Sequence, residues 1–425
     1  MAQQSENSKA EKPDSADSSP YRYVIEVLIF LTYAAFGMTW AAAGPFLKRL
    51  MHDLGLTLSQ GSFMTTSVSF AKIFGPTLAG ALMARLGLRW AFMAASALIC
   101  VGILAPMSPS YGLILLARFA MGIGGAMVVV YFTPVVMKWF SSRERLVING
   151  INFVAINVGM TISLFITPYV QAALGDSWQK ALIAYSLVSV VLAVAWLILG
   201  RDAEEKSQEG GSGAGEASYG YAGALRDANT WKLAFTYMGA LSLYLSIVAY
   251  FPKFYGDKFG EAAGFWILHA PAVAMAMGIP ASIIGIMLTQ STGLRLPFVR
   301  WAGLLLIPSV LGMFLLNSTA LSLAASVMTG FCLFIWASPF FTIPQELPGM
   351  TAKKSGYLMG IFWGACYIAA TFNVWLVGKI AEMNGNEFLW GFVYITIVSS
   401  SMFLGSFLLP ETGPRAKPAP SLSHS

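Results

Sequence analysis

The chain has 425 residues, of which 56% are hydrophobic and 11% charged, and its formal net charge at pH 7 is +6. Soluble domains carry about 25% charged residues, so this composition excludes an ordinary soluble protein and favours one whose surface faces lipid. The positive charge does not indicate nucleic-acid binding, because the basic residues lie in short segments between apolar runs rather than in one basic stripe.

Twelve apolar runs of membrane-crossing length follow one another along the chain. The first six lie near residues 24–47, 60–84, 90–108, 112–137, 148–174 and 178–200. The second six lie near residues 231–252, 264–288, 298–316, 319–342, 356–378 and 388–409. The short alternating segments of a membrane β-barrel do not recur. We therefore expect an all-α membrane protein of about 12 transmembrane helices in two six-helix bundles.

Polar stretches divide these runs into domains. The segment EEKSQEGGSGAGEAS lies between the two sets, and Gly/Ser-rich sequences of this kind behave as flexible coil. The expected divisions are a disordered cytoplasmic tail (1–20), a first bundle (21–201), a cytoplasmic linker (202–230), a second bundle (231–412) and a cytoplasmic tail (413–425).

The distribution of Lys and Arg predicts the orientation in the membrane. The tails, the linker and the loops on their side hold 18 of these residues, the opposite loops hold six, and Lys72 and Arg118 lie inside runs. Basic loops remain on the cytoplasmic side. We expect a multi-pass protein of the cytoplasmic (inner) membrane with both termini in the cytoplasm.

The loop after the second run carries a recognisable motif. It places Gly80, Arg85, Gly87 and Arg89 in a pattern that resembles the signature of the major facilitator superfamily, with Ala84 in place of the family's aspartate. The resemblance implies the major facilitator fold, with two bundles related by a pseudo-two-fold axis, and a gating role for these glycines and arginines. Without the aspartate, we expect the arginines to find other acceptors, such as carbonyl groups at helix C-termini or a carboxylate of the second bundle. The alternative is that they only anchor the loop.

Two further resemblances concern function. Arg118 precedes Gly122-Ile-Gly124 by four residues, which is similar to the family's second signature. Residues 40–45 and 138–145 are similar to the anion-handling branches of the family, such as the oxalate/formate, cyanate and nitrate porters. The resemblance implies a secondary active or facilitated transporter.

Lys72 is the most informative single residue. It lies about 12 residues from either end of its run, or about 18 Å along a helix, which is too far for its side chain to reach the membrane surface. A polar stripe at helical spacing consists of Ser62, Thr65, Ser69, Lys72 and Pro76. A central lysine costs about 2.5–3.5 kcal/mol on insertion scales. We expect its ammonium group to face a cavity between the bundles and to attract an anion, the alternative being a structural partner elsewhere.

Polar residues of spans four and five are further candidates. Arg118 lies deeper than a loop residue, and the resemblance associates it with proton coupling or gating. Hydrogen bonding to backbone carbonyls is the alternative. Asn149 and Asn152 share a helix face with Ser163 and Thr167. We expect that face to meet the substrate or, alternatively, to bond a neighbouring helix.

Aromatic and polar residues of other spans are candidates for the same site. Further candidates for lining the pocket are Trp40, Tyr244, Trp363, Tyr367 and Asn373. Most aromatic residues in such a chain serve packing or lie at the membrane interface. Gly356, Gly360 and Gly364 predict close packing of span eleven. His269 is expected to be structural, and no carboxylate for a proton relay is visible inside a span unless Glu26 is drawn inward.

These features predict transport rather than catalysis. The chain has three histidines, and we find no catalytic or metal-binding constellation and no cofactor motif. No Walker motif occurs, so ATP is not expected to drive the process within this chain. We therefore expect alternating-access transport of a small organic or inorganic anion and no enzyme activity.

The expected partners are an anionic small solute, a coupling proton or an exchanged solute, and the lipid bilayer, with no nucleic acid and a monomeric state. Two alternatives remain open at this stage. One is a transporter of a neutral or cationic solute, including efflux. The other is a non-transporting scaffold or receptor on the same fold. The substrate, the direction and the coupling ion do not follow from the sequence.

Overall fold

The structure is a computed structural model, and it describes residues 20–140, 144–201, 220–260, 264–350 and 352–415. Its regular elements are all helices, and no strand is found in these ranges. The expected tail 1–20, apart from its last residue, and most of the linker, residues 202–219, lie outside the described residues.

The first half of the chain forms seven α-helices and a 3₁₀ turn, Val101–Leu104. The helices are α1 (Tyr21–Ala41), α2 (Leu47–Leu54), α3 (Leu58–Ala71), α4 (Gly75–Cys100), α5 (Tyr111–Trp139), α6 (Arg145–Ala173) and α7 (Trp178–Leu199). The helices of the second half are α8 (Gly220–Arg226), α9 (Ala228–Phe259), α10 (Phe265–Leu268), α11 (Ala270–Ala276), α12 (Gly278–Thr292), α13 (Leu296–Leu315), α14 (Thr319–Phe334), α15 (Ala337–Glu346), α16 (Ala352–Met383), α17 (Leu389–Ser399) and α18 (Ser401–Gly405).

These helices account for the expected spans. Ten segments of the described chain are long and apolar enough to cross a membrane, and Leu389–Gly405 is a shorter apolar stretch. The remaining span consists of α3 and the first part of α4, which bends away at Gly87. Gly87 has φ 73° and ψ 171°, a backbone conformation that favours glycine. The expectation of about 12 spans is confirmed.

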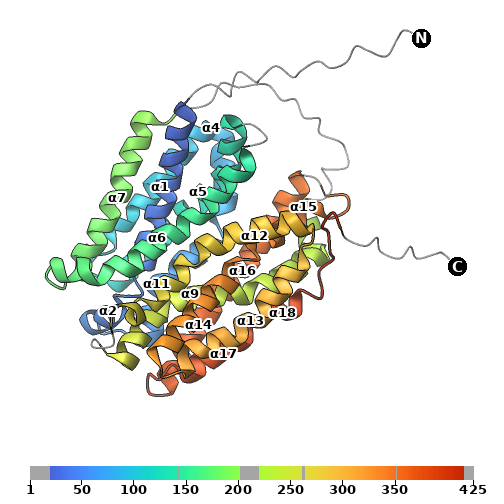
Figure 1. Cartoon of the computed structure of the whole chain (residues 1–425). Helices are drawn as coiled ribbons and strands as arrows, with labels where there is room; N and C mark the ends of the chain where they lie inside the picture. Colours follow the sequence, from blue (N-terminus) through green and yellow to red (C-terminus); the bar gives the residue numbers. More distant parts are fainter. Residues whose placement is uncertain (1–19, 141–143, 202–219, 261–263, 351, 416–425) are drawn as a thin grey trace, which may run out of the picture.

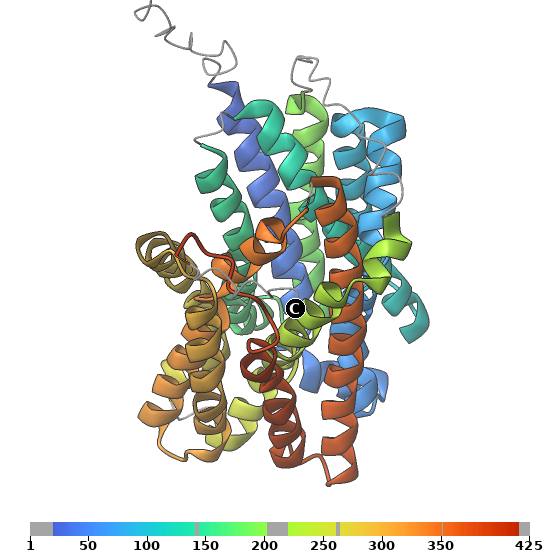
Figure 2. The ribbon, with the colours of Figure 1, turned by 90° about the vertical axis from the view of Figure 1, so that its right-hand side faces the viewer.

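The spans are grouped in two bundles, one built from α1 to α7 and the other from α9 to α18 (Figures 1 and 2). The closest helix pairs lie within a bundle: α4 with α5, α1 with α6, α9 with α16 and α13 with α14. A Cβ on Gly159 of α6 would lie 1.8 Å from the carbonyl oxygen of Ala34 on α1, so glycine allows these two backbones to touch.

The two bundles diverge toward the side on which the described chain begins and ends (Figure 1). We call this the terminal side, and the opposite side the far side. The linker differs from the expected coil at its end, because Gly220–Arg226 is helical and α9 already begins at Ala228. Asp227 caps α9 by accepting a hydrogen bond from the Asn229 N–H. The Trp231 indole of α9 donates to the Leu225 carbonyl of α8, and this bond joins the two helices.

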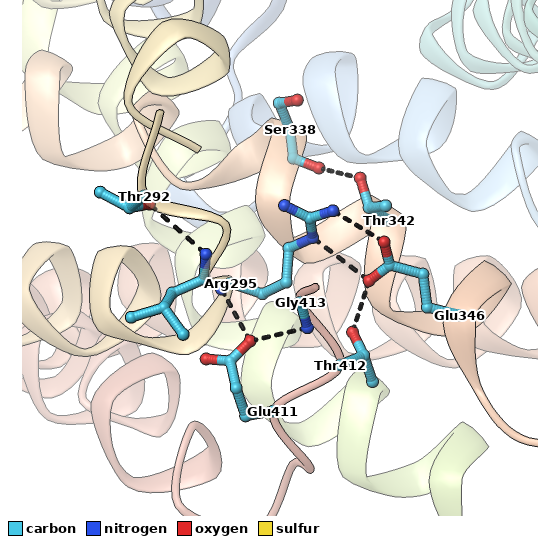
Figure 3. A network of polar contacts seen from close by, with 9 residues as sticks. Thr292, Arg295, Ser338, Thr342, Glu346, Glu411, Thr412 and Gly413 are labelled. Atoms are coloured by element: carbon cyan, nitrogen blue, oxygen red, sulfur yellow. Dashed lines mark hydrogen bonds and ion pairs between the residues drawn. The ribbon is translucent and has the colours of Figure 1, made fainter. Parts of the chain in front are cut away.

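A polar network closes the terminal side of the second bundle (Figure 3). Arg295, between α12 and α13, donates two hydrogen bonds to the Glu346 carboxylate, at 2.7 and 3.2 Å. Thr412 donates to the same carboxylate at 2.6 Å. The Glu411 carboxylate accepts the backbone N–H groups of Arg295 and Leu296 at 2.8 and 2.9 Å, and thereby caps α13.

The same network includes the first residues of the segment 413–425, for which the sequence predicts a cytoplasmic tail. The Arg415 N–H donates to the Gly293 carbonyl at 3.2 Å, and its guanidinium donates to the Thr292 carbonyl at 3.3 Å. Gly413 packs so closely that an added Cβ would lie 2.2 Å from the Gly293 oxygen. Composition did not reveal this, because the acceptors belong to a loop more than a hundred residues earlier. Residues 416–425 lie outside the described residues.

We expect Glu346→Gln to lower the free energy of unfolding at neutral pH by about 1 kcal/mol, and the melting temperature with it. Burial raises the pKa of the Glu346 carboxyl, but hydrogen bonds from Arg295 and Thr412 and the charge of Arg295 lower it more, so its pKa lies below the ordinary 4.5. A lowered pKa means that the carboxylate stabilises the fold above pH 4.5 and loses this effect as the pH falls through the lowered value.

Thermal unfolding in detergent between pH 7 and pH 3.5 tests this prediction. The difference from wild type should be largest at neutral pH and shrink in acid. The exposed Glu387→Gln is the control and should melt like wild type at every pH. A difference for Glu346→Gln that grows in acid would contradict the assignment.

Candidate functional site

A break in the second span positions Lys72. Helix α3 ends at Ala71, and Pro76, near the start of α4, has no N–H to donate to the Lys72 carbonyl. The backbone N–H groups of Lys72, Ile73 and Phe74 instead bond carbonyls three residues earlier. The tighter turn of this 3₁₀ geometry reorients the chain here.

The Lys72 side chain is buried, with 4% of its surface exposed, and it lies between the bundles. Its ammonium Nζ lies 4.1 Å from the centre of the Trp40 ring and 5.2 Å from that of Phe36, both on α1. It donates a hydrogen bond at 3.3 Å to the Tyr367 hydroxyl on α16 of the other bundle. No carboxylate in the described part of the chain pairs with it. The ammonium charge is therefore held by aromatic faces and one hydroxyl group.

Tyr244 makes a second contact between the bundles. Its hydroxyl lies 3.2 Å from the Asn157 amide oxygen and 2.6 Å from the Met160 sulfur, both on α6. Trp363 stacks on Tyr367 with ring centres 5.6 Å apart. The structure thus brings Trp40, Lys72, Tyr367 and Trp363 into one cluster, with Tyr244 also at the interface between the bundles.

A cavity of about 940 Å³ opens beside this cluster, toward the terminal side. It is lined by Ile73 and Pro76 of the first bundle and by α8, α9 and α16 of the second. Gly360 and Gly364 also line it: an added Cβ would meet only Tyr221 at 3.4 Å and Ile73 at 4.0 Å, respectively. The expectation that Gly360 and Gly364 serve close helix packing is therefore wrong, because an added Cβ would meet only side chains at ordinary contact distance and no neighbouring backbone. The surroundings of Gly356 lie outside the described part of the structure.

On the far side the bundles touch. The Ser59 hydroxyl donates to the Glu382 carboxylate at 2.7 Å, and the Lys48 ammonium lies 3.9 Å from the Asp257 carboxylate. Gly44 approaches so closely that an added Cβ would lie 2.0 Å from the Val248 carbonyl oxygen. Each pair joins the first bundle to the second, so the far side is closed.

Arg118 is held inside the first bundle. Its guanidinium donates to the carbonyls of Met64, Trp40 at 3.0 Å and Thr39 at 3.5 Å, and only 1% of the residue is exposed. These carbonyls belong to α1 and α3. The geometry matches the structural alternative and leaves Arg118 behind the Lys72 cluster rather than in it.

Asn152 also lies away from the cluster. It is buried beside Glu26 of α1, and the two side chains face each other inside the first bundle. Glu26 is 6% exposed, so the protein draws this carboxyl inward from the end of its span. The Asn149 side chain lies outside the described residues.

The structure does not bring Asn373 to the cluster. Its amide nitrogen donates to the Ser242 hydroxyl at 3.0 Å, and its oxygen accepts from the Tyr394 hydroxyl at 2.6 Å. Both partners belong to the second bundle. The sequence shows that an amide lies within the span, but not on which side of α16 its partners stand.

The residues predicted to gate the terminal side are spread over α4. The Arg89 guanidinium donates to the Leu197 carbonyl in the last turn of α7, at 3.3 Å, which is the kind of acceptor that the missing aspartate led us to expect. Arg85 is exposed. Gly80 has no atom near its Cβ position, so its packing does not require glycine, whereas the conformation of Gly87 does.

Sequence reasoning missed several residues of the interface. Phe36 precedes Trp40 by four residues, so the helical period could have placed it on the same face. The contacts of Asn157 with Tyr244 and of Ser59 with Glu382 join distant parts of the chain and leave no local signal. In the described residues, no group of three or more His, Cys, Asp or Glu side chains could hold a metal ion.

Known proteins share this architecture. The family model described as Major Facilitator Superfamily matches residues 29–371. The chain is 24% identical over 381 residues to the probable nitrate transporter NarT of Staphylococcus carnosus. The matched stretch covers 86% of this chain and 91% of that protein. It is 31% identical over 164 residues to the hexuronate transporter of Escherichia coli K12, 38% of this chain and 36% of that protein. The inward-open structure of the E. coli xylose transporter XylE superposes with a TM-score of 0.73 at 14% identity, covering 93% and 98% of the two chains.

Two helical bundles with a polar cluster between them define a multi-pass membrane transporter of small solutes, not an enzyme. The chain belongs to the Major Facilitator Superfamily.

Proposed function

We propose that this transporter carries a small anion by alternating access, with Lys72 supplying the charge attraction. The observation that carries the proposal is the position of the Lys72 ammonium between the bundles with no carboxylate partner among the described residues. A buried cation without a counter-ion is costly, and binding an anion beside it removes part of that cost. The same charge would repel a cationic solute.

The relatives support an anion as the solute. Nitrate and hexuronate, which two relatives are named for, both carry negative charge. At 24% and 31% identity these names indicate a class of solute and not one molecule.

We propose further that the protein spans the inner membrane of a bacterial cell and that both termini lie in the cytoplasm. The tails, the linker and the loops that the sequence assigns to their side hold 18 basic residues, against six in the opposite loops, and this distribution supports the orientation. The far side is then the outside, and its closed contacts make the described conformation inward-facing. Rocking of the bundles about the cluster would expose Lys72 to the outside, with Gly80, Arg85, Gly87 and Arg89 acting where α4 must close against the second bundle.

Gradient-driven uptake and exchange both remain compatible with this site. Glu26, buried beside Asn152 in the first bundle, is the carboxyl that could carry a coupling proton. The proposed transporter acts as a monomer, because one chain supplies both halves of the cluster.

We expect purified protein in liposomes to take up labelled anions and to leave neutral and cationic solutes outside. The panel would comprise nitrate, formate, oxalate and glucuronate, with xylose and choline as the neutral and cationic probes. Protein-free liposomes give the background. Uptake of xylose or choline without uptake of any anion would refute the anion proposal, and the absence of uptake of all probes would favour a scaffold or receptor.

A further inference from the structure

His269 lies on the far side, at the junction of α10 and α11, and 6% of its surface is exposed. Its ring faces α6 of the first bundle, so it is part of the far-side closure. The sequence favours a structural role for this residue, and the structure shows what its ring does in that position.

Both ring nitrogens of His269 face backbone carbonyl oxygens. Nδ1 lies 2.7 Å from the Phe265 oxygen, one turn earlier in the same bundle. Nε2 lies 3.2 Å from the Phe165 oxygen on α6. A carbonyl oxygen only accepts, so each contact needs an N–H on the ring. Neutral imidazole has one N–H, whereas imidazolium has two.

The shorter contact decides which bond depends on the second proton. The local contact with Phe265 is the shorter one, and we therefore assign the hydrogen of the neutral ring to Nδ1. Its Nε2 lone pair then points at the Phe165 oxygen, and the two acceptors repel. Protonation of Nε2 converts this repulsion into a charge-assisted hydrogen bond between the bundles.

Aromatic rings surround the His269 ring on both bundles. The His269 ring is nearly parallel to Phe265, Phe165 and Tyr169, with centres 4.2, 5.4 and 5.9 Å away. The faces of aromatic rings attract cations. Phe165 and Tyr169 belong to α6, so these contacts also cross between the bundles.

Other titratable groups near the junction are engaged elsewhere or carry no charge. On α6 the neighbour is the Tyr169 phenol, and on α14 the titratable residue is Cys332. On α9, Tyr255 bonds the Met313 carbonyl and Ser326, and Lys258 bonds the carbonyls of Phe314 and Leu316. Asp257 pairs with Lys253 and, across the bundles, with Lys48. Glu261 lies outside the described residues. Among the described residues that contact its ring, His269 is the group whose hydrogen bond to the other bundle forms by gaining a proton.

We propose that His269 is a proton-binding site in the far-side closure, and that protonation from the far side locks the bundles together there. The proton comes from water on the far side, adds to Nε2, and returns to that water when the bundles separate. Because binding is reciprocal, the closed conformation also holds the proton more tightly than the open one. Low pH on the far side then favours the conformation open to the terminal side.

Distance measurements between spin labels test the proposal without a substrate. Ala173→Cys, at the far-side end of α6, and Asn317→Cys, between α13 and α14, are exposed and report on the two bundles. The three native cysteines would be replaced. The short label-to-label distance represents the conformation closed on the far side, and the long distance the open one. We expect acidification from pH 8 to pH 5.5 to raise the ratio of the short-distance to the long-distance population about tenfold, which corresponds to the gain of one charge-assisted hydrogen bond.

His269→Gln should abolish this pH dependence, whereas His52→Gln should keep it, because His52 is an exposed residue of α2 that pairs with Asp53. A pH response that persists in His269→Gln, or its absence in the wild type, would overturn the proposal. Neither outcome depends on whether the solute is an anion.

A second measurement keeps His269 intact, in case the variant folds poorly. In a chain with His52→Gln and His424→Gln, nitrogen NMR of labelled histidine reports on His269 alone. We expect protons on both nitrogens at pH 5.5 and on Nδ1 alone at pH 8. A neutral His269 ring at both pH values, or a hydrogen on Nε2 alone, would refute the proposal that His269 is a proton-binding site.

Discussion

Lys72→Ala is expected to reduce anion uptake about 10- to 100-fold, which corresponds to losing one hydrogen bond to a charged group. The variant should still insert and fold, because the ammonium makes one 3.3 Å hydrogen bond and no ion pair in the described residues. Removing a desolvated charge without a counter-ion does not leave an opposite charge unpaired. The substitution should therefore weaken anion binding and leave the folding of the protein intact.

Lys72→Arg should transport at an intermediate rate. Guanidinium keeps the charge but is planar and larger than ammonium. The space between the rings of Trp40 and Tyr367, whose centres lie 4.1 and 5.2 Å from Nζ, is shaped for the smaller group.

Initial rates in liposomes containing equal amounts of folded protein measure the effect. Lys180→Ala, an exposed lysine at the start of α7, is the matched control and should transport like wild type. Normal anion uptake by Lys72→Ala would refute the role of Lys72 in binding, and a neutral solute would become the better hypothesis.

The second large effect is expected on stability, at Arg118. Arg118→Ala would leave the buried carbonyl oxygens of Met64, Trp40 and Thr39 without this donor. A buried acceptor without a partner costs about 1–3 kcal/mol, so the variant should lose several kcal/mol of folding free energy or fail to accumulate. Because Trp40 is one of these partners, the Lys72 cluster should be disturbed as well.

Thermal unfolding followed by size-exclusion chromatography measures this loss. Arg118→Lys should recover part of the stability, since an ammonium can satisfy some of the carbonyls but lacks the guanidinium geometry. Arg49→Ala, at an exposed arginine of α2, is the control. If Arg118→Ala melts like wild type and instead weakens anion affinity, Arg118 binds substrate and our structural interpretation is wrong.

Much of the fold followed from the sequence because the membrane imposes local rules. A span must be apolar over a fixed length, and basic loops prefer one side. Runs such as 178–200 and 319–342 therefore correspond closely to α7 and to α14 with α15. The depth of Lys72 could be recognised in the same way, because distance along a helix is a property of the chain itself.

Only the tertiary structure decided which side chains meet. Hydropathy does not fix the rotation of a helix about its axis, so the polar character of Asn373 and Arg118 was visible but their partners within one bundle were not. The cavity beside Gly360 and Gly364 and the packing of Arg415 on the loop after α12 depend likewise on segments far apart in the sequence. The sequence by itself determined how many spans there are, where they lie and how deep Lys72 is, because lipid acts on each segment separately. The aromatic surroundings of Lys72 and the contact of His269 with α6 were decided by the packing of two bundles, since each requires groups from both.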